Sequence, residues 1–367
     1  MNIDRITLTH VRIPLVEPFK ISNGEISEKD GIIVGVHSDG LIGYGESSPM
    51  SGSFYSKETP ESTWECLRHD LVPRILQAKP DSIEGVNAVL DQVSGNSFAN
   101  AGIETAFWDL FAQRSDEPLH RVLGGNRNTV ESGLAVGIYP TISKLLSAIQ
   151  RHLVDGYKRV KVKIQPGWDI EPLLAIRGEF GNIKLMVDAN CAYRHADLEH
   201  LQALDDFGLM MIEQPLPEGD LEGHARLQAM MRTPVCLDES AKDLPSLKKA
   251  IELKSCRIVN IKIQRVGGLR NAKQMHDVCR DAGISVWAGT MPELGIGGVQ
   301  TLHLATLENF GFPTDVESSA RWFVDDIVDP LIEVKRGVIE IPRGVGNCYQ
   351  ADLRKLLKYK IRGQEFT

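Results

Sequence analysis

The sequence predicts an α/β protein whose larger part is a (β/α)8 barrel of the TIM type, preceded by an α+β domain. Two observations support this prediction. Strand-like and helix-like segments alternate after residue 125, which is typical of a parallel sheet with crossover helices. In the same part, charged residues recur at intervals of 25, 25, 25 and 24 residues, about the length of one βα unit: Lys163, Asp188, Glu213, Asp238 and Lys262.

Composition narrows the class of protein. The chain has 367 residues, 42% of them hydrophobic and 25% charged, as expected of a soluble globular protein with two domains. Its net charge of −8 argues against a nucleic-acid partner. The 6 cysteines show no metal-ligand spacing, so we expect reduced thiols. No segment approaches the roughly 20 apolar residues of a membrane span, and the N-terminus lacks a signal-peptide core, so we expect a cytoplasmic protein without a membrane partner.

The first domain is expected to span residues 1–125. Residues 18–30 are polar and predict a mobile loop, and residues 49–60 predict a second loop. Residues 61–122 space their apolar side chains at three and four positions, which predicts helices. The turn at Gly124 marks the boundary. Three alternating runs before the helices predict an antiparallel meander: 6–15, 31–38 and 41–47.

The barrel is expected to span residues 126–330. An eighth strand is expected near 312–314, and the alternating stretch 336–347 predicts a strand that returns to the first domain within a C-terminal segment, 331–367. The other seven strands are predicted at 131–138, 158–164, 184–190, 209–214, 234–239, 257–263 and 284–290. Helices are predicted between them, at 142–155, 170–180, 195–207, 243–253 and 270–282.

Three acidic residues, Asp188, Glu213 and Asp238, each end an apolar run. A buried strand tolerates a carboxylate only at its solvent-facing end, so the three side chains should meet at the barrel mouth. They would repel one another unless a cation neutralised them. Mg²⁺ fits these hard oxygen ligands best, and Mn²⁺ has a similar preference. For any one acid alone, a salt bridge or a helix cap is the simpler explanation.

Two lysines flank these acids along the chain. Lys161 and Lys163 lie two residues apart on one strand and should both point into the barrel. Burial beside another amine and a metal ion should lower the pKa of such a lysine toward the range of a base. Lys262 belongs to the sixth strand, roughly opposite the second. A lone lysine in a strand is more simply explained as a snorkelling residue, but two amines across a metal site could address both faces of one carbon.

The predicted chemistry is removal of a proton next to a carboxylate. That proton is weakly acidic because its loss creates a dianionic enediolate, which a divalent cation stabilises. With one lysine, the enediolate can expel a β-leaving group; with two, it can be reprotonated on the opposite face.

These residues stand in short motifs that resemble the enolase superfamily, in particular its muconate-lactonising-enzyme subgroup. The motifs are Lys161-Val162-Lys163, Val187-Asp188-Ala189-Asn190, Ile212-Glu213-Gln214-Pro215, Leu237-Asp238-Glu239-Ser240 and Asn260-Ile261-Lys262. The resemblance implies a capping domain over a modified barrel. It also implies Mg²⁺ on Asp188, Glu213 and Asp238, with Lys163 and Lys262 as the acid/base pair acting on a small carboxylate substrate. Relatives of this kind form homo-oligomers, either dimers or octamers.

Within the subgroup, the chain looks most like the o-succinylbenzoate synthase and N-succinylamino acid racemase branch, in which Arg265 would tune the second lysine. The same resemblance implies that Asn190 contacts metal-site groups, that Glu239 lies behind them, and that loops at Phe19 and Ser51 close over the substrate. Further substrate-site positions follow from the branch: Lys161, Tyr55, Thr290, Met291 and Glu293.

The chain departs from that branch at several substrate positions. After the seventh strand it reads Gly-Thr-Met-Pro-Glu-Leu over residues 289–294, and Thr290 and Leu294 are similar to cycloisomerase-like relatives. Ala135 and Ala320 replace expected polar residues. A dipeptide epimerase and a muconate-type cycloisomerase therefore stay open. From other classes, so do a Schiff-base aldolase acting through Lys262 and a non-enzymatic relative that binds a metabolite.

Overall fold

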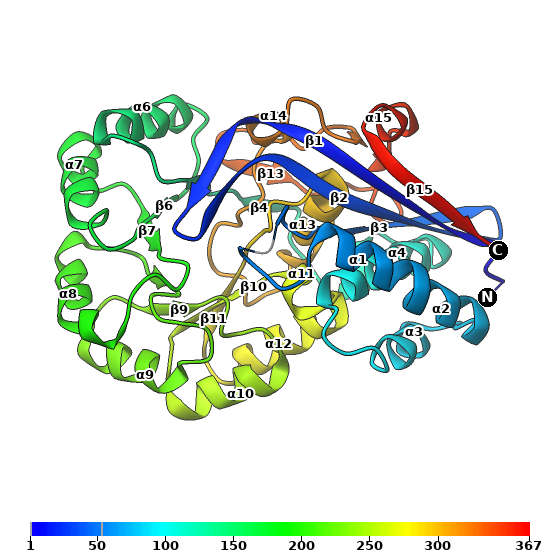
Figure 1. The fold of residues 1–367 in the computed structure, drawn as a ribbon, viewed down its shortest axis with the longest axis horizontal. Coiled ribbons are helices and arrows are strands. Elements are labelled where there is room, and N and C mark those ends of the chain that lie inside the picture. Colours follow the sequence, from blue (N-terminus) through cyan, green and yellow to red (C-terminus); the bar gives the residue numbers. More distant parts are fainter. Residues whose placement is uncertain (1, 53) are drawn as a thin grey trace.

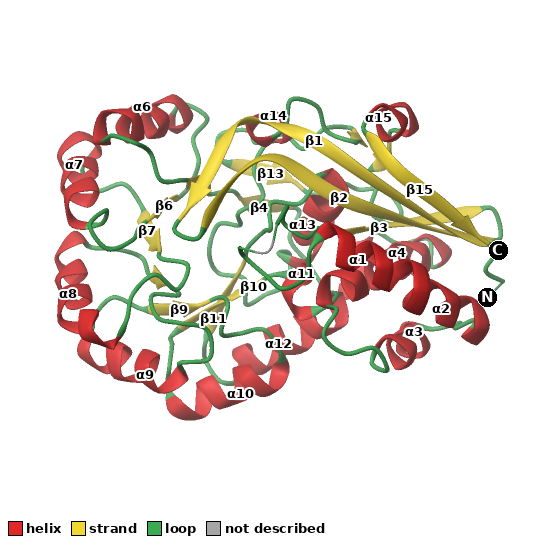
Figure 2. Cartoon of the chain, in the orientation of Figure 1, coloured by secondary structure: helices red, strands yellow, loops and turns green. Residues whose placement is uncertain are grey.

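A computed structural model describes residues 2–52 and 54–367 of the chain. A curved parallel sheet surrounded by helices forms one side of the molecule, and a long antiparallel sheet with its own helices forms the other (Figure 1). Colouring by secondary structure separates the two parts: short strands inside a ring of helices, and long strands beside a helical layer (Figure 2). The sequence prediction of an α/β barrel with an α+β N-terminal domain is confirmed.

The antiparallel sheet has the strand order β15-β1-β2-β3. Its strands are β1 (Arg5–Ile21), β2 (Gly24–Ser38), β3 (Leu41–Ser47) and β15 (Lys360–Phe366). Alternate apolar side chains of β1 and β2 turn to one face, where Trp64, Leu67 and Phe107 pack against them. These three belong to the helical layer, which comprises α1 (Pro60–Cys66), the π-helical turn η1 (Leu67–Leu71), α2 (Val72–Ala78), α3 (Ile83–Leu90) and α4 (Ser97–Arg114).

The stretch 18–30 is not the loop that the sequence predicts. It forms the tip of the β1–β2 hairpin, where Phe19 pairs with Ile26 beyond an irregularity that follows Pro14. Apolar side chains alternate there with charged ones, so their buried face is easy to overlook in a polar stretch. The tip rests on the barrel: the Ile138 amide donates to the Lys20 carbonyl (2.8 Å), and Ser22 Oγ donates to the Ala189 carbonyl (3.1 Å).

Seven parallel strands form the barrel sheet in the order of the chain. They are β5 (Leu134–Val136), β6 (Val160–Lys163), β7 (Leu185–Asp188), β8 (Ile212–Glu213), β9 (Val235–Leu237), β10 (Ile258–Ile261) and β11 (Ser285–Ala288). Each lies within its predicted range. Sequential parallel neighbours bring the carboxyl ends of all these strands to one mouth.

The eighth position is filled by an irregular segment rather than a full strand. The amides of Gly311 and Asp315 donate to the β11 carbonyls of Val286 and Ala288 (3.0 and 3.1 Å). On the other side, the Gly133 amide donates to the Thr314 carbonyl (2.9 Å), just before β5. The segment near 312–314 therefore closes the ring through single bridges, which explains its faint strand pattern.

Helices surround the barrel and fill the connections. These are α6 (Ile142–Leu153), α7 (Ile170–Phe180), η2 (His195–Asp197), α8 (Leu198–Gln202), η3 (Ala203–Phe207), α9 (Leu221–Met230), α10 (Leu244–Leu253), α11 (Ile263–Val266), α12 (Leu269–Asp281), α13 (Gly295–Leu304) and α14 (Ser319–Trp322). Two more short helices, α5 (Leu119–Leu123) and α15 (Leu353–Lys358), lie at the junction of the two parts. No helix among the described residues is long and apolar enough to cross a membrane.

The returning strand is also displaced from its predicted position. Within 336–347, β13 (Val338–Glu340) pairs with β4 (Thr129–Glu131), which precedes the barrel, and not with the N-terminal sheet. The strand that joins the N-terminal sheet is β15, antiparallel to β1. β15 is amphipathic and charged, as an edge strand often is, so its alternation does not stand out in the sequence. A second short pair, β12 (Val328–Asp329) with β14 (Gln350–Ala351), fixes the segment between them.

Candidate active site

The charged residues that recur along the sequence meet at the carboxyl ends of neighbouring strands. Lys163 pairs with Asp188 in the β6–β7 register, and Asp188 pairs with Glu213 in the β7–β8 register. Asp238 and Lys262 follow directly after β9 and β10. All five are buried. The regular spacing therefore reflects one level of the barrel, as the sequence suggested.

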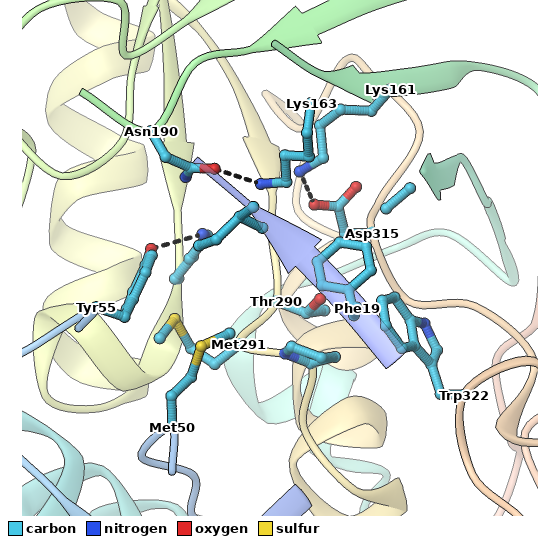
Figure 3. A pocket seen from close by; sticks show the side chains of 14 residues that line it. Phe19, Met50, Tyr55, Lys161, Lys163, Asn190, Thr290, Met291, Asp315 and Trp322 are labelled. Carbon is cyan, nitrogen blue, oxygen red and sulfur yellow. Dashed lines mark hydrogen bonds and ion pairs between the residues drawn. The ribbon is translucent and has the colours of Figure 1, made fainter. Parts of the chain in front are cut away.

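Lys163 lies against the first acid. Its Nζ donates to Asp188 Oδ2 (2.5 Å) and to Asn190 Oδ1 (2.9 Å), as Figure 3 shows for the second contact. Asn190 has a positive φ of 41°, and this turn lets its amide donate back to Asp188 Oδ1 (3.0 Å). Its side-chain nitrogen donates to Glu239 Oε1 (3.1 Å). Asn190 therefore orients one lysine and links it to an acid behind the site.

Lys262 approaches from the other side of the mouth. Its Nζ donates to Asp238 Oδ2 (2.8 Å) and to the Tyr55 hydroxyl (3.3 Å). The guanidinium of Arg265 bonds both Asp238 Oδ1 and the same hydroxyl. Burial would lower the pKa of Lys262, but the charge of Asp238 raises it well above the usual value.

Lys161 contacts an acid that the sequence analysis missed. Its Nζ bonds Asp315 and lies 3.5 Å from Glu213 Oε2 and 3.7 Å from Asp188 Oδ2. Asp315 belongs to the irregular eighth segment, beyond the last of the regularly spaced charges. Its position directly after the predicted eighth strand is the sequence feature that could have identified it. Burial opposes the charge of Lys161, yet these carboxylates raise its pKa. These carboxylates thus favour the charged forms of Lys161 and Lys262, and the lower lysine pKa expected beside a bound metal ion stays a prediction.

The three acids have different electrostatic environments. Burial works against the charge of Asp188 and Asp238, but Lys163 lowers the pKa of Asp188, and Arg265 with Lys262 lowers that of Asp238. Burial and the neighbouring Asp188 raise the pKa of Glu213 well above its usual value. Glu213 Oε1 accepts from Asn260 Nδ2 (2.6 Å), whereas its buried Oε2 accepts no hydrogen bond from the described residues.

As these side chains lie, no three His, Cys, Asp or Glu residues in the described part of the chain form a ready metal site. Asp188 and Asp238 each hold a lysine ammonium, and Lys161 lies near Glu213. The donor set nevertheless suits Mg²⁺. It offers carboxylate oxygens alone. Glu213 Oε2 accepts no hydrogen bond from the described residues, has the Lys161 ammonium 3.5 Å away and lies beside two other carboxylates, a setting that a divalent cation stabilises.

A pocket opens beside Lys163 and Lys262. Lys161, Lys163, Lys262 and Asn190 line its polar side. Its apolar side comes from both parts of the molecule, and Figure 3 shows the ring of Phe19 beside Trp322. The members of this apolar side are Phe19, Ile21, Met50, Ala135, Met291, Pro292 and Trp322.

Most predicted substrate positions reach this pocket. Tyr55, Thr290 and Met291 line it together with Phe19. Ser51 does not: its Oγ donates to Asp30 Oδ2 (2.5 Å). Glu293 lies behind the wall, where its Oε2 accepts from the Met291 amide (3.0 Å). Met50 and Trp322 were missed as individual contacts, because an apolar residue outside a charged motif carries no pattern that would single it out.

Fold and site together define a class that comparison with known proteins identifies. Residues 3–124 match the family described as mandelate racemase / muconate lactonizing enzyme, N-terminal domain, and residues 144–355 match the one described as enolase C-terminal domain-like. The chain therefore belongs to the mandelate racemase and muconate lactonizing enzyme family of the enolase superfamily.

Relatives that match nearly the whole chain have named activities, and two of them serve as examples. The chain is 43% identical to an o-succinylbenzoate synthase of Geobacillus kaustophilus, over 98% of this chain and 96% of the relative. It is 40% identical to an N-succinylamino acid racemase of Thermus thermophilus, over 94% of each.

Solved structures agree with this placement. An enolase-superfamily protein of Listeria innocua Clip11262 superposes with a TM-score of 0.95 at 35% identity, over 100% of this chain and 99% of the other. A dipeptide epimerase of Enterococcus faecalis V583, complexed with Mg and the dipeptide L-Leu-L-Tyr, gives a TM-score of 0.89 at 29% identity, over 95% of this chain and 100% of the other.

Proposed function

We propose that this enzyme removes the proton next to the carboxylate of a small organic acid. It would then either dehydrate the precursor of o-succinylbenzoate or racemise an N-succinylamino acid. The observation that carries the proposal is the placement of two lysine amines, Lys163 and Lys262, on opposite sides of one pocket. The two named relatives with these activities match nearly the whole chain and support the same choice.

The cofactor that suits the site is Mg²⁺, with Mn²⁺ as an alternative. Asp188, Glu213 and Asp238 would hold it, which accords with the Mg in the solved dipeptide epimerase. Bound there, the cation would supply the positive charge that stabilises the acid once its α-proton has left.

The two lysines would divide the proton transfer. In its neutral form, Nζ of one lysine takes the α-proton, and the ammonium of the other delivers a proton to the opposite face. Because Asp238 favours the charged form of Lys262, release of a proton from Lys262 depends on that carboxylate being neutralised. For dehydration, one lysine suffices as base, and the β-hydroxyl leaves with a proton from the enzyme.

The test is α-proton exchange in D₂O with a panel of N-succinyl amino acids. We expect deuterium incorporation that disappears with EDTA and returns with Mg²⁺. Lys163→Ala should abolish exchange from one enantiomer, because that amine addresses one face of the carbon. No exchange across a broad panel of carboxylates would refute the proposal. Borohydride trapping of a keto substrate on Lys262, with activity independent of metal, would instead support the aldolase alternative.

Assembly into a homo-oligomer, a dimer or an octamer, stays a prediction from the resemblance. Sedimentation of the purified protein would decide between these states.

A further inference from the structure

Lys29, on β2, is a buried lysine outside the catalytic pair, with an exposed fraction of 1%. Its Nζ donates to three backbone carbonyls: Ser48 (3.0 Å), Pro49 (3.3 Å) and Met291 (3.2 Å). An ammonium group has three N–H donors, so these contacts use all of them. Two of the carbonyls belong to the N-terminal domain and one to the barrel.

The three carbonyls belong to the two segments that build the apolar side of the pocket. Pro49 immediately precedes Met50, and Met291 is itself a pocket residue. Figure 3 shows the side chains of Met50 and Met291 next to each other below the lysines. One ammonium therefore fixes the backbone at both methionines, although Lys29 and Met291 are 262 positions apart.

Other buried groups anchor the same segments individually. Gln264, two residues after Lys262, accepts from the Ser48 amide (2.9 Å) and donates to the Glu46 carbonyl (2.7 Å). The Glu46 carboxylate accepts from the amides of Leu294 and Gly297 (both 2.8 Å). Lys29 differs from Gln264 and Glu46 because its ammonium bonds the backbone of both the segment that carries Met50 and the segment that carries Met291.

Burial of an ammonium group costs free energy because the charge loses its hydration. Burial lowers the pKa of Lys29, and the nearby charges of Glu46, Glu293 and Asp30 oppose that effect. An apolar side chain would avoid the desolvation of a charge, but it would leave three buried carbonyls without donors. What the ammonium provides is a fixed distance between segments of two domains.

We propose that Lys29 is a positioning residue that sets the separation of Met50 and Met291, and thereby determines which apolar group of the acid substrate the pocket accepts. The inference deepens the proposed function and depends on it for the identity of the substrate class, N-acylated amino acids with bulky apolar side chains. Lys29 itself does not line the pocket, so its effect acts through the two methionines.

The test compares Lys29→Met with a matched control, Gln300→Met. Gln300 is also buried and joins the same two domains, because its Nε2 on α13 donates to the Tyr44 carbonyl (2.9 Å). It does not belong to the pocket. A general loosening of the domain contact should affect both variants equally, whereas loss of positioning should affect only Lys29→Met.

For Lys29→Met, KM for N-succinylphenylalanine should rise about tenfold while kcat changes less than about threefold, because the loss is in binding and not in the proton transfer. KM for N-succinylalanine should stay near the wild-type value, and Gln300→Met should leave both unchanged. Lys29→Gln, which keeps two N–H donors, should fall between wild type and Lys29→Met. It also replaces that variant if Lys29→Met does not fold.

Amide hydrogen exchange provides a readout that needs no turnover. Peptides covering 46–52 and 289–294 should exchange faster in Lys29→Met, or in Lys29→Gln, than in Gln300→Met. Equal exchange and equal KM changes in the two kinds of variant would overturn the inference. An inactive wild type would refute the proposed function alone, and the exchange data would still decide whether Lys29 positions these segments.

Discussion

Glu213 lies among carboxylates, and one of its oxygens, Oε2, accepts no hydrogen bond from the described residues. Burial and Asp188 raise its pKa well above the usual value, so the fold disfavours its charged form. An acid with a raised pKa weakens the folded state as the pH rises through that pKa. A metal-binding role for the Glu213 carboxylate would explain why the protein has an acid at a position where its charge reduces stability.

Glu213→Gln should separate the two effects. The side chain keeps its oxygen for Asn260 but loses its charge, so activity should fall by more than about a hundredfold, because a metal ligand and its charge are lost. Thermal unfolding with and without Mg²⁺ should show whether the loss of activity comes from weaker metal binding. Saturating Mg²⁺, at about 100 times its Kd, should stabilise the wild type by about 2.7 kcal/mol and the variant by much less. Equal stabilisation of both proteins by Mg²⁺ would contradict a metal role for Glu213.

Close packing between elements fixes how the two domains are built. Strand β3 lies so near α4 that a Cβ added at Gly45 would come within 2.1 Å of the Gly102 carbonyl oxygen, and one at Gly43 within 2.2 Å of the Ala106 carbonyl oxygen. Backbone oxygens cannot move aside as side-chain ends can. Glycine is therefore required at this contact for space.

Two alanine substitutions should have opposite effects on stability. Gly45→Ala should lower the free energy of unfolding by about 1–3 kcal/mol or more, because it overpacks a strand against a helix backbone. Gly178→Ala, on α7, meets no atom within 4 Å among the described residues and should raise it by about 0.5–1 kcal/mol. Urea unfolding of the three proteins measures both. A neutral Gly45→Ala would show that β3 and α4 can separate.

The predictability of each element follows from the kind of pattern it carries. The strands that end in Asp188 and Glu213 could be located because burial on both faces leaves a continuous apolar run that ends in a charge, and the strand at Lys163 because its apolar and charged residues alternate. The hairpin tip at 18–30 and the edge strand β15 could not, because their outward faces are charged and only tertiary contacts define the inward face. The roles of Asp315 and Lys29 could not be predicted either, because each depends on contacts between segments that are far apart in the sequence.

At the scale of the whole molecule, two stacked histidines lie where three regions of the chain meet. His120 on α5 and His303 on α13 have ring centroids 5.6 Å apart, and His303 Nε2 bonds the Asn347 carbonyl oxygen (3.1 Å). Burial, with a smaller effect of His120, lowers the pKa of His303 to about 4. The fold therefore favours neutral His303, although histidine in an unfolded chain is half protonated near pH 6.5.

Acid should weaken this junction in a defined pH window. With the folded pKa of His303 at about 4 and the unfolded value at 6.5, its contribution is present above pH 6.5 and is lost as the pH falls toward 4. The total is about 3 kcal/mol at 1.36 kcal/mol per pKa unit. His303→Gln keeps a donor for Asn347 but cannot titrate, so its free energy of unfolding should decline less over this range. Parallel pH curves for both proteins would contradict the assignment.

The pairing of β1 with β15 joins residues 6 and 366 in one register. During synthesis, the outer edge of β1 emerges from the ribosome hundreds of residues before its neighbour exists. Until then, that edge presents unpaired backbone groups to any other extended chain nearby. Crowding of newly made copies is therefore a hazard for this protein during its production. A chaperone that shields an N-terminal hairpin would help its yield more than one that acts on the finished barrel.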